Sequence, residues 1–132
     1  MVSVGERARR KKTVTRSDIE LYSEITGDYN PLHYDPDAAS QSRFGGVIVQ
    51  GGVTSGILNA LVAQDLPGPG SVFLHVDWSF KAPVRPGDEI TGEVEVLEVR
   101  DDKPITKLRT AVFNQKGVLV LDGIAVVYTD PL

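Results

Sequence analysis

Cysteine is absent from this 132-residue chain, and histidine occurs only twice. Without a thiol the protein has no disulfide, no thiolate nucleophile and no cysteine-ligated zinc. Long apolar runs are missing too, because no stretch of about 18 apolar residues occurs and none follows the charged start MVSVGERARRKK. We therefore expect a soluble, cytoplasmic protein that does not span a membrane.

The charge balance gives little support to a nucleic-acid partner. The net charge is −4, and no aromatic residues are interleaved with the one cationic cluster, which comprises Arg7, Arg9, Arg10, Lys11 and Lys12. We expect a solvated N-terminal arm leading into a first strand, and no nucleic acid bound to it. A modest alternative is that these cations lie near an anionic small ligand.

Composition predicts a single domain over residues 1–132. Apolar residues make up 41% of the chain, enough to bury a core without metals or disulfides. Residues 51–66, GGVTSGILNALVAQDL, are apolar on most of a helical circumference, so we expect a central helix surrounded by protein. One face of that helix carries a strip of small and polar residues: Gly52, Ser55, Gly56 and Asn59. The strip fits close packing against a sheet or room for a ligand, and a buried Asn59 carboxamide would need polar partners.

Two shorter helices are predicted before the central one. Ser17 and Glu20 fit a capping box, and helical spacing then continues until Gly27 ends the helix. Asp35 followed by a proline fits the cap and first turn of a second helix over residues 36–42.

The rest of the chain is typical of strands. Short turn-rich segments separate four candidate strands, at residues 71–82, 88–100, 104–114 and 117–129. Three short connections predict an antiparallel meander, a change of apolar phase predicts a β-bulge near residue 97, and the almost continuously apolar last strand should lie inside the sheet.

These elements predict an α+β fold of the hotdog type, in which a curved antiparallel β-sheet wraps a long central helix. A twisted sheet that curls around an apolar helix buries both apolar surfaces. One such sheet leaves an open edge, so we also expect a two-fold dimer that covers it.

The stretch SEITGDYNPLHYD, residues 23–35, carries the most chemistry. Asp28 and His33 flank an Asn-Pro turn, and proline restricts the backbone so that the bend can bring both side chains to one side. A carboxylate and an imidazole can then act as base and acid. From the residues alone, the same pattern also fits a turn in which Asp28 caps backbone amides and His33 hydrogen-bonds a carbonyl.

Residues 22–61 resemble the MaoC-type dehydratase family, particularly its (R)-specific enoyl-CoA hydratase members. The matching motifs are a Gly-Asp-x-Asn-Pro-x-His segment, an Asp-x-x-x-Ala helix, a phenylalanine and the Ile-Val-x-Gly start of the central helix, and the similarity continues nearly to the chain end. The resemblance implies a hotdog homodimer and a lyase of fatty acid metabolism. Its reaction would be reversible hydration of trans-2-enoyl thioesters carried by coenzyme A or acyl-carrier protein.

The resemblance also implies roles for individual residues. Asp28 would activate water for attack at C3, and His33 would position that water and shuttle a proton to C2. The Gly51 amide at the helix start would stabilise charge on the thioester oxygen. Four further residues complete the expected substrate-binding set: Gln50, Asn59, Asn30 and Phe44. No metal or organic cofactor is required.

Three positions depart from the family pattern. Gln50 stands where the family usually has histidine, and Asn59 stands where close hydratase relatives carry a serine. Gly52 replaces a residue that is more often bulky and apolar, which predicts a wider pocket, so a short acyl chain is not assumed. Two other functions stay open: an acyl-CoA thioesterase, in which a carboxylate directs water to the carbonyl carbon, and a non-catalytic acyl-thioester-binding domain.

Overall fold

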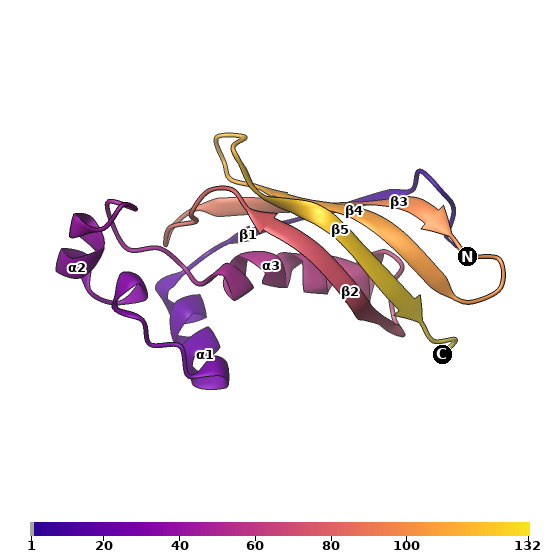
Figure 1. Ribbon diagram of the computed structural model, residues 1–132, viewed down its shortest axis with the longest axis horizontal. Coiled ribbons are helices and arrows are strands. Elements are labelled where there is room, and N and C mark those ends of the chain that lie inside the picture. The colour runs from indigo at the N-terminus through magenta and orange to yellow at the C-terminus, as the bar shows by residue number, and fades with distance from the viewer. Residues whose placement is uncertain (1) are drawn as a thin grey trace.

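A computed structural model describes residues 2–132 of the protein. In Figure 1 one antiparallel sheet arches over helix α3 (Gly51–Ala60), while α1 (Arg16–Thr26) and α2 (Pro36–Gln41) lie beyond one end of the sheet. Both termini lie at the opposite end. The predicted α+β hotdog fold is confirmed.

The sheet is built from five strands in the order β1-β3-β4-β5-β2. Their bounds are β1 Arg7–Thr13, β2 Ser71–Phe80, β3 Glu89–Val99, β4 Ile105–Phe113 and β5 Leu119–Thr129. The predicted bulge is confirmed, because the β3–β4 register shifts between Val96 and Glu98. The last strand lies inside the sheet as predicted, between β4 and β2.

The meander prediction is wrong for β2, which pairs with β5 and not with β3. Eight residues separate Phe80 from Glu89, and two of them are prolines, which favour extended backbone. When extended, such a segment reaches about 26 Å, enough to pass the two strands between β2 and β3, which is three spacings of about 4.8 Å. This connection, residues 81–88, crosses the start of α3, where the Val49 amide donates to the Val84 carbonyl over 2.8 Å.

The N-terminal cations form strand β1 itself and not an arm that precedes it. Four of them pair with carboxylates: Arg7 with Glu95, Arg9 with Glu93, Arg10 with Asp65 and Lys12 with Asp18. Their charge is thus partly neutralised within the fold.

Helix α1 begins two residues earlier than the sequence pattern indicated. The capping box joins Thr15 and Asp18, because Thr15 has extended backbone angles while Ser17 already lies within the first turn. The predicted caps at the other positions are confirmed: Gly27 ends α1 with φ of 79°, and the Asp35 side chain accepts from two amides at the start of α2.

Asp18 links the stability of α1 to pH. Partial burial alone would raise its pKa, but the hydrogen bond from the Thr15 amide and the Lys12 ammonium outweigh burial and hold the pKa below its usual value. A lowered folded-state pKa stabilises the fold above the unfolded value and loses that effect as pH falls through the folded value.

We therefore expect Asp18→Asn to lower the free energy of unfolding by about 1 kcal/mol at neutral pH. The difference from the unsubstituted protein should shrink as pH falls below the unfolded-state pKa and through the lowered folded-state pKa of Asp18. Urea unfolding across pH measures it, with Glu20→Gln as the matched control on the same helix. An equal effect of Glu20→Gln would contradict this assignment and would support the capping box of Ser17 and Glu20 that the sequence predicted.

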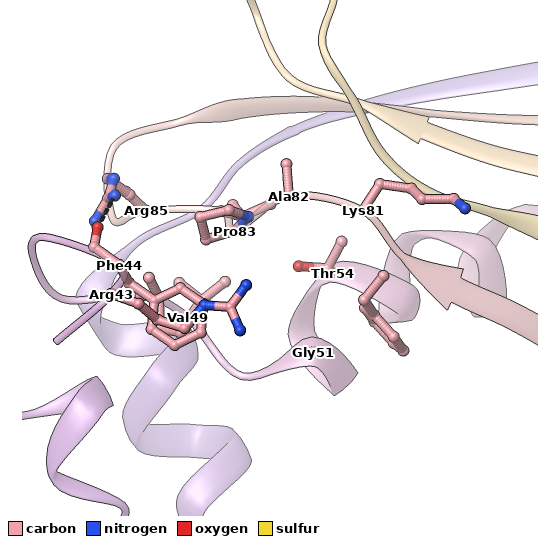
Figure 2. A pocket seen from close by; sticks show the side chains of 12 residues that line it. Arg43, Phe44, Val49, Gly51, Thr54, Lys81, Ala82, Pro83 and Arg85 are labelled. Atoms are coloured by element: carbon pink, nitrogen blue, oxygen red, sulfur yellow. Dashed lines mark hydrogen bonds between the residues drawn. The ribbon is translucent and has the colours of Figure 1, made fainter.

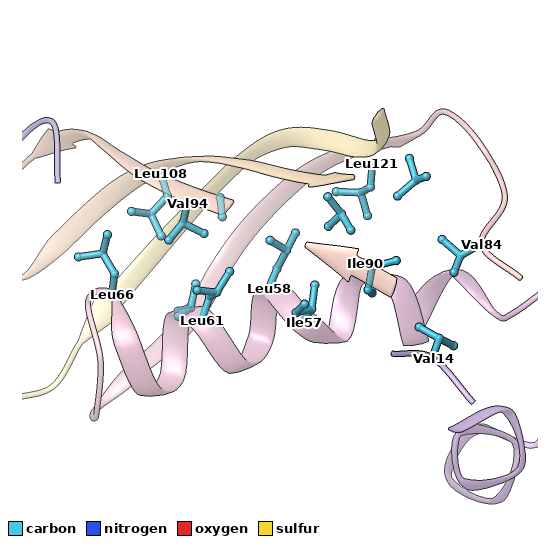
Figure 3. Close-up of a cluster of buried hydrophobic side chains, with 14 of the residues drawn as sticks. Val14, Ile57, Leu58, Leu61, Leu66, Val84, Ile90, Val94, Leu108 and Leu121 are labelled. Carbon is cyan, nitrogen blue, oxygen red and sulfur yellow. The ribbon is translucent and has the colours of Figure 1, made fainter. Parts of the chain in front are cut away.

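The core lies between α3 and the sheet. Figure 3 shows Ile57 and Leu58 of α3, and Leu61 just past its end, pointing at β3, β4 and β5, where they belong to one buried cluster with Val94 and Leu108. At Gly92 an added Cβ would lie 2.9 Å from Ile57 and 3.0 Å from Leu61, so glycine lets the helix approach β3 closely.

The central helix is less enclosed than predicted, and it changes form. Its α-helical part ends at Ala60 and continues as the π-helical turn η2 (Leu61–Asp65). Gly51 and Asn59 are exposed, because the sheet covers only one side of α3. The expectations of a helix surrounded by protein and of a buried Asn59 are therefore wrong for this chain.

Candidate active site

The loop between α1 and α2 carries the two predicted catalytic side chains. After Gly27 the chain forms a short 3-10 helix, η1 (Pro31–His33), whose first turn is capped by the Asn30 side chain. The Asn30 Oδ1 atom accepts from the Leu32 amide at 3.1 Å. Asn30 therefore shapes the turn that brings His33 back to the side of Asp28.

Asp28 and His33 face each other across this turn. The Asp28 Oδ2 and His33 Nε2 atoms are 3.7 Å apart, and the imidazole is sheltered while 37% of the carboxylate side chain is exposed. The other carboxylate oxygen, Oδ1, accepts from the Asn30 amide at 3.2 Å. Asp28 thus holds the turn with one oxygen and presents the other to the histidine.

The tautomer of His33 follows from its second contact. His33 Nδ1 lies 2.7 Å from the Ile48 carbonyl oxygen. A carbonyl only accepts, so Nδ1 carries the proton and Nε2 of a neutral ring is an acceptor. The Asp28 carboxylate also only accepts, so the two atoms can both receive a hydrogen bond from one donor, such as a water molecule. The interpretation as a backbone turn is confirmed, because Asp28 accepts from an amide and His33 bonds a carbonyl, and the same contacts bring the two side chains together.

The same contacts tie the loop to the start of α3. The Ile48 amide donates to the Leu32 carbonyl at 3.2 Å, and Gly51 begins the helix three residues after Ile48. No side chain caps α3, so its first amides are available to an acceptor. An added Cβ at Gly51 would lie 3.0 Å from the Phe80 ring, so only glycine fits there without moving that ring.

A cavity of about 570 Å³ opens beside Gly51. Its wall includes the crossing connection, whose Arg85 donates to the Phe44 carbonyl (Figure 2) and to the Val47 carbonyl and so fixes the facing loop. Arg43 and Lys81 also line the cavity and are exposed. The cavity therefore joins an uncapped helix start to two accessible cations.

The structure does not gather every predicted site residue at this cavity. Gly51 and Phe44 line it, whereas Asp28 and His33 reach it only through the backbone contacts at Ile48. Asn59 is exposed and lies about 12 Å along the helix from Gly51. Gly52 does not widen the pocket, because the Tyr22 ring occupies the place of a side chain there. That prediction is wrong.

Gln50 points away from the cavity into the protein. Its side chain is buried, and Nε2 donates to the Ile19 carbonyl and to Ser23 Oγ, each at 3.1 Å. Sequence reasoning missed Ser23, although a usable signal was present: Ser23 follows Ile19 by four residues and so falls on the buried face of α1.

Across residues 2–132, no group of three or more His, Cys, Asp or Glu side chains is placed to hold a metal ion. Over the same residues, no helix has the length and apolarity needed to cross a membrane.

Comparison with known proteins gives concordant matches. The model of a family described as MaoC like domain matches residues 3–116. The (R)-specific enoyl-CoA hydratase of Aeromonas caviae is 42% identical over 126 residues, covering 96% of this chain and 94% of that protein. The 3-hydroxybutyryl-CoA dehydratase of Methylorubrum extorquens is 36% identical, covering 96% of this chain and 80% of that protein. The solved structure of an (R)-hydratase from A. caviae involved in PHA biosynthesis matches with a TM-score of 0.92 at 41% identity, covering 98% of both chains.

Proposed function

The chain belongs to the MaoC-like domain family, and we propose that Asp28 and His33 are the acid–base pair with which it reversibly adds water to trans-2-enoyl thioesters. The observation that carries the proposal is the 3.7 Å separation between Asp28 Oδ2 and His33 Nε2, with both side chains anchored to backbone groups. The reaction is that of a hydro-lyase, in the (R)-specific class named for the A. caviae relative.

The proposed step uses one water molecule held between the two side chains. The water oxygen bonds to C3 of the enoyl group while one water proton passes to the pair, and C2 receives a proton from the pair. The net change is addition of H and OH across the double bond, and both side chains return to their starting states. The Ile48 carbonyl keeps the His33 ring in place throughout, because its bond to Nδ1 is not exchanged.

Charge that develops on the thioester oxygen needs a donor, and the Gly51 amide is suited to it. Gly51 begins a helix that no side chain caps, where the helix dipole favours negative charge. One such donor contributes about 10²- to 10³-fold in rate. The proposed chemistry needs no metal or organic cofactor, because side chains and one amide supply every group.

Coenzyme A is the first carrier to test. Both relatives described above carry CoA in their names. Arg43 and Lys81 are exposed cations at the cavity beside Gly51, and cations of this kind attract the phosphates of a coenzyme A thioester.

The test is incubation of the purified protein with a short trans-2-enoyl-CoA, followed by mass spectrometry. Gain of one water on an intact thioester is the expected result. Release of free coenzyme A would replace the proposal with a thioesterase, and binding without turnover of any enoyl thioester would replace it with a non-catalytic acyl-thioester-binding domain.

We also propose that the protein is a homodimer joined along β2. This strand is at an edge of the sheet, and it exposes several apolar side chains, namely Val72, Leu74, Val76 and Phe80. Exposed apolar edge strands favour pairing with a second chain. Phe80 also lines the cavity, so a second copy on β2 would adjoin the site.

Val76→Lys is expected to shift the protein toward the monomer, because it places a charge on the proposed interface. Sedimentation velocity at fixed concentration measures the effect. Val118→Lys is the matched control, since Val118 is 44% exposed and Val76 is 40% exposed. A dimer that survives Val76→Lys and dissociates with Val118→Lys would move the interface to the β4–β5 turn.

A further inference from the structure

We propose that Ser23, Tyr34 and Gln50, here called the Ser23 hub, position Asp28 for catalysis through buried hydrogen bonds. The inference rests on the proposed function, because it assigns Asp28 the role of base. None of the three side chains touches the proposed reacting atoms, so each is a positioning residue. The hub joins α1, the catalytic loop and the residue that precedes Gly51.

The hydrogen bonds of the hub have a fixed direction. Ser23 Oγ donates its single proton to the Asp28 carbonyl at 2.7 Å. It accepts from Tyr34 Oη at 2.5 Å and from Gln50 Nε2 at 3.1 Å. A hydroxyl has one donor and two acceptor sites, and all three are in use. Because Tyr34 and Gln50 both donate to Ser23 Oγ, the Asp28 carbonyl is the acceptor that remains for the Ser23 proton.

Burial makes these contacts consequential. Ser23 is fully buried and Gln50 is 2% exposed, so water cannot replace a lost partner. Among residues 2–132, the Gln50 Oε1 atom is the one buried side-chain nitrogen or oxygen without a hydrogen-bond partner. The Gln50 amide is thus used only as a donor, and it holds Ser23 and the Ile19 carbonyl together.

The hub acts on the carboxylate through the Asp28 backbone. The Asp28 amide donates to Thr26 Oγ1 at 3.2 Å, and its carbonyl is held by Ser23, so both peptides that flank the residue are fixed. Without the Ser23 hydroxyl, the peptide after Asp28 loses its carbonyl restraint, and the contact from the Asn30 amide to Oδ1 is left to hold the turn. His33 would stay in place, because the Ile48 carbonyl holds it independently. Loss of the hub is therefore expected to displace the Asp28 carboxylate relative to His33.

Kinetics of three variants test the hub. Ser23→Ala and Gln50→Leu are each expected to lower kcat for enoyl-CoA hydration by about 10- to 100-fold with KM unchanged, because displacement of a catalytic group by about 1 Å costs up to that factor. The double variant should fall little below Ser23→Ala alone, since both act through one network. Ser71→Ala is the matched control: this hydroxyl bonds Thr129 Oγ1 at 2.9 Å, in the β2–β5 pair. Its kcat should not change.

Two measurements separate positioning from a structural role. In an Asp28→Asn background, Ser23→Ala should leave the residual rate within about twofold, because the group it positions is gone. An equal loss in both backgrounds would overturn the hub. So would full activity of Ser23→Ala while Asp28→Asn is inactive, a result that leaves the proposed function standing.

A crystal structure of Ser23→Ala tests the geometry apart from turnover. The separation between Asp28 Oδ2 and His33 Nε2, 3.7 Å here, is expected to change by about 1 Å. An unchanged separation would overturn the hub even if no enoyl thioester reacts. If Ser23→Ala does not fold, Tyr34→Phe replaces it, because that variant keeps the ring that stacks on Tyr29 and loses only the hydroxyl, which contacts Ser23 Oγ and, at 3.4 Å, the Ile19 carbonyl.

Discussion

Replacing Asp28 with asparagine is expected to lower kcat for enoyl-CoA hydration by about 10²- to 10⁴-fold, the range for loss of a general base. Asparagine keeps the shape of the side chain, and its oxygen can still accept from the Asn30 amide, which now bonds Asp28 Oδ1. What is lost is the ability to take a proton from water. KM and the midpoint of thermal unfolding should therefore change little.

The measurement is steady-state hydration of a short trans-2-enoyl-CoA by both proteins, with Asp37→Asn as the matched control. Asp37 is an exposed aspartate in the first turn of α2, outside the pair. Its replacement should leave kcat within about twofold. Retention of a tenth or more of kcat by Asp28→Asn would remove Asp28 from the role of base.

The largest expected effect on stability is at Gly123. Gly123→Ala should lower the free energy of unfolding by about 3 kcal/mol or more, the sum of backbone strain and a steric overlap. Gly123 has φ of 151°, and an added Cβ would overlap the Asp77 carbonyl of the neighbouring strand. Asp77 lies on the edge strand β2 opposite Gly123, so its backbone cannot move aside without disturbing the β2–β5 pairing.

Urea unfolding followed by tryptophan fluorescence measures this effect well. Trp78 is the only tryptophan, and it pairs with Gly123 across β2 and β5. Gly56→Ala is the matched control, since nothing lies near an added Cβ in that helix and alanine is favoured there by about 1 kcal/mol. Equal destabilisation by both variants would contradict the steric argument.

Local signals explain why most elements could be predicted. Apolar period, turn residues and caps are properties of short segments, and they identified the helices, the strands and the bulge after Val96. Pairing is not local: nothing in residues 81–88 states which strand β2 joins, and only the packed sheet shows that the segment crosses α3. The start of α1 was misplaced because Ser17 and Thr15 both suit a cap, and only backbone angles distinguish them.

The candidate site divides in the same way. Asp28 and His33 could be found because the turn that joins them is short and carries its own proline. The surroundings of Gly52 and Gln50 could not be predicted, because they are set by α1, a helix more than twenty residues earlier. Tyr22 of α1 lies against Gly52, and Ser23 accepts a hydrogen bond from Gln50. In the sequence, the only signal of such a long-range contact is a polar residue on an otherwise apolar helix face.

The crossing connection has a consequence for how the site opens. Its bond from the Val49 amide to the Val84 carbonyl, and the Arg85 bonds to the facing loop, join the cavity wall to the segment that starts α3. We expect the amides of this wall and of the start of α3 to exchange as one cooperative unit, because these bonds must break together before either segment opens.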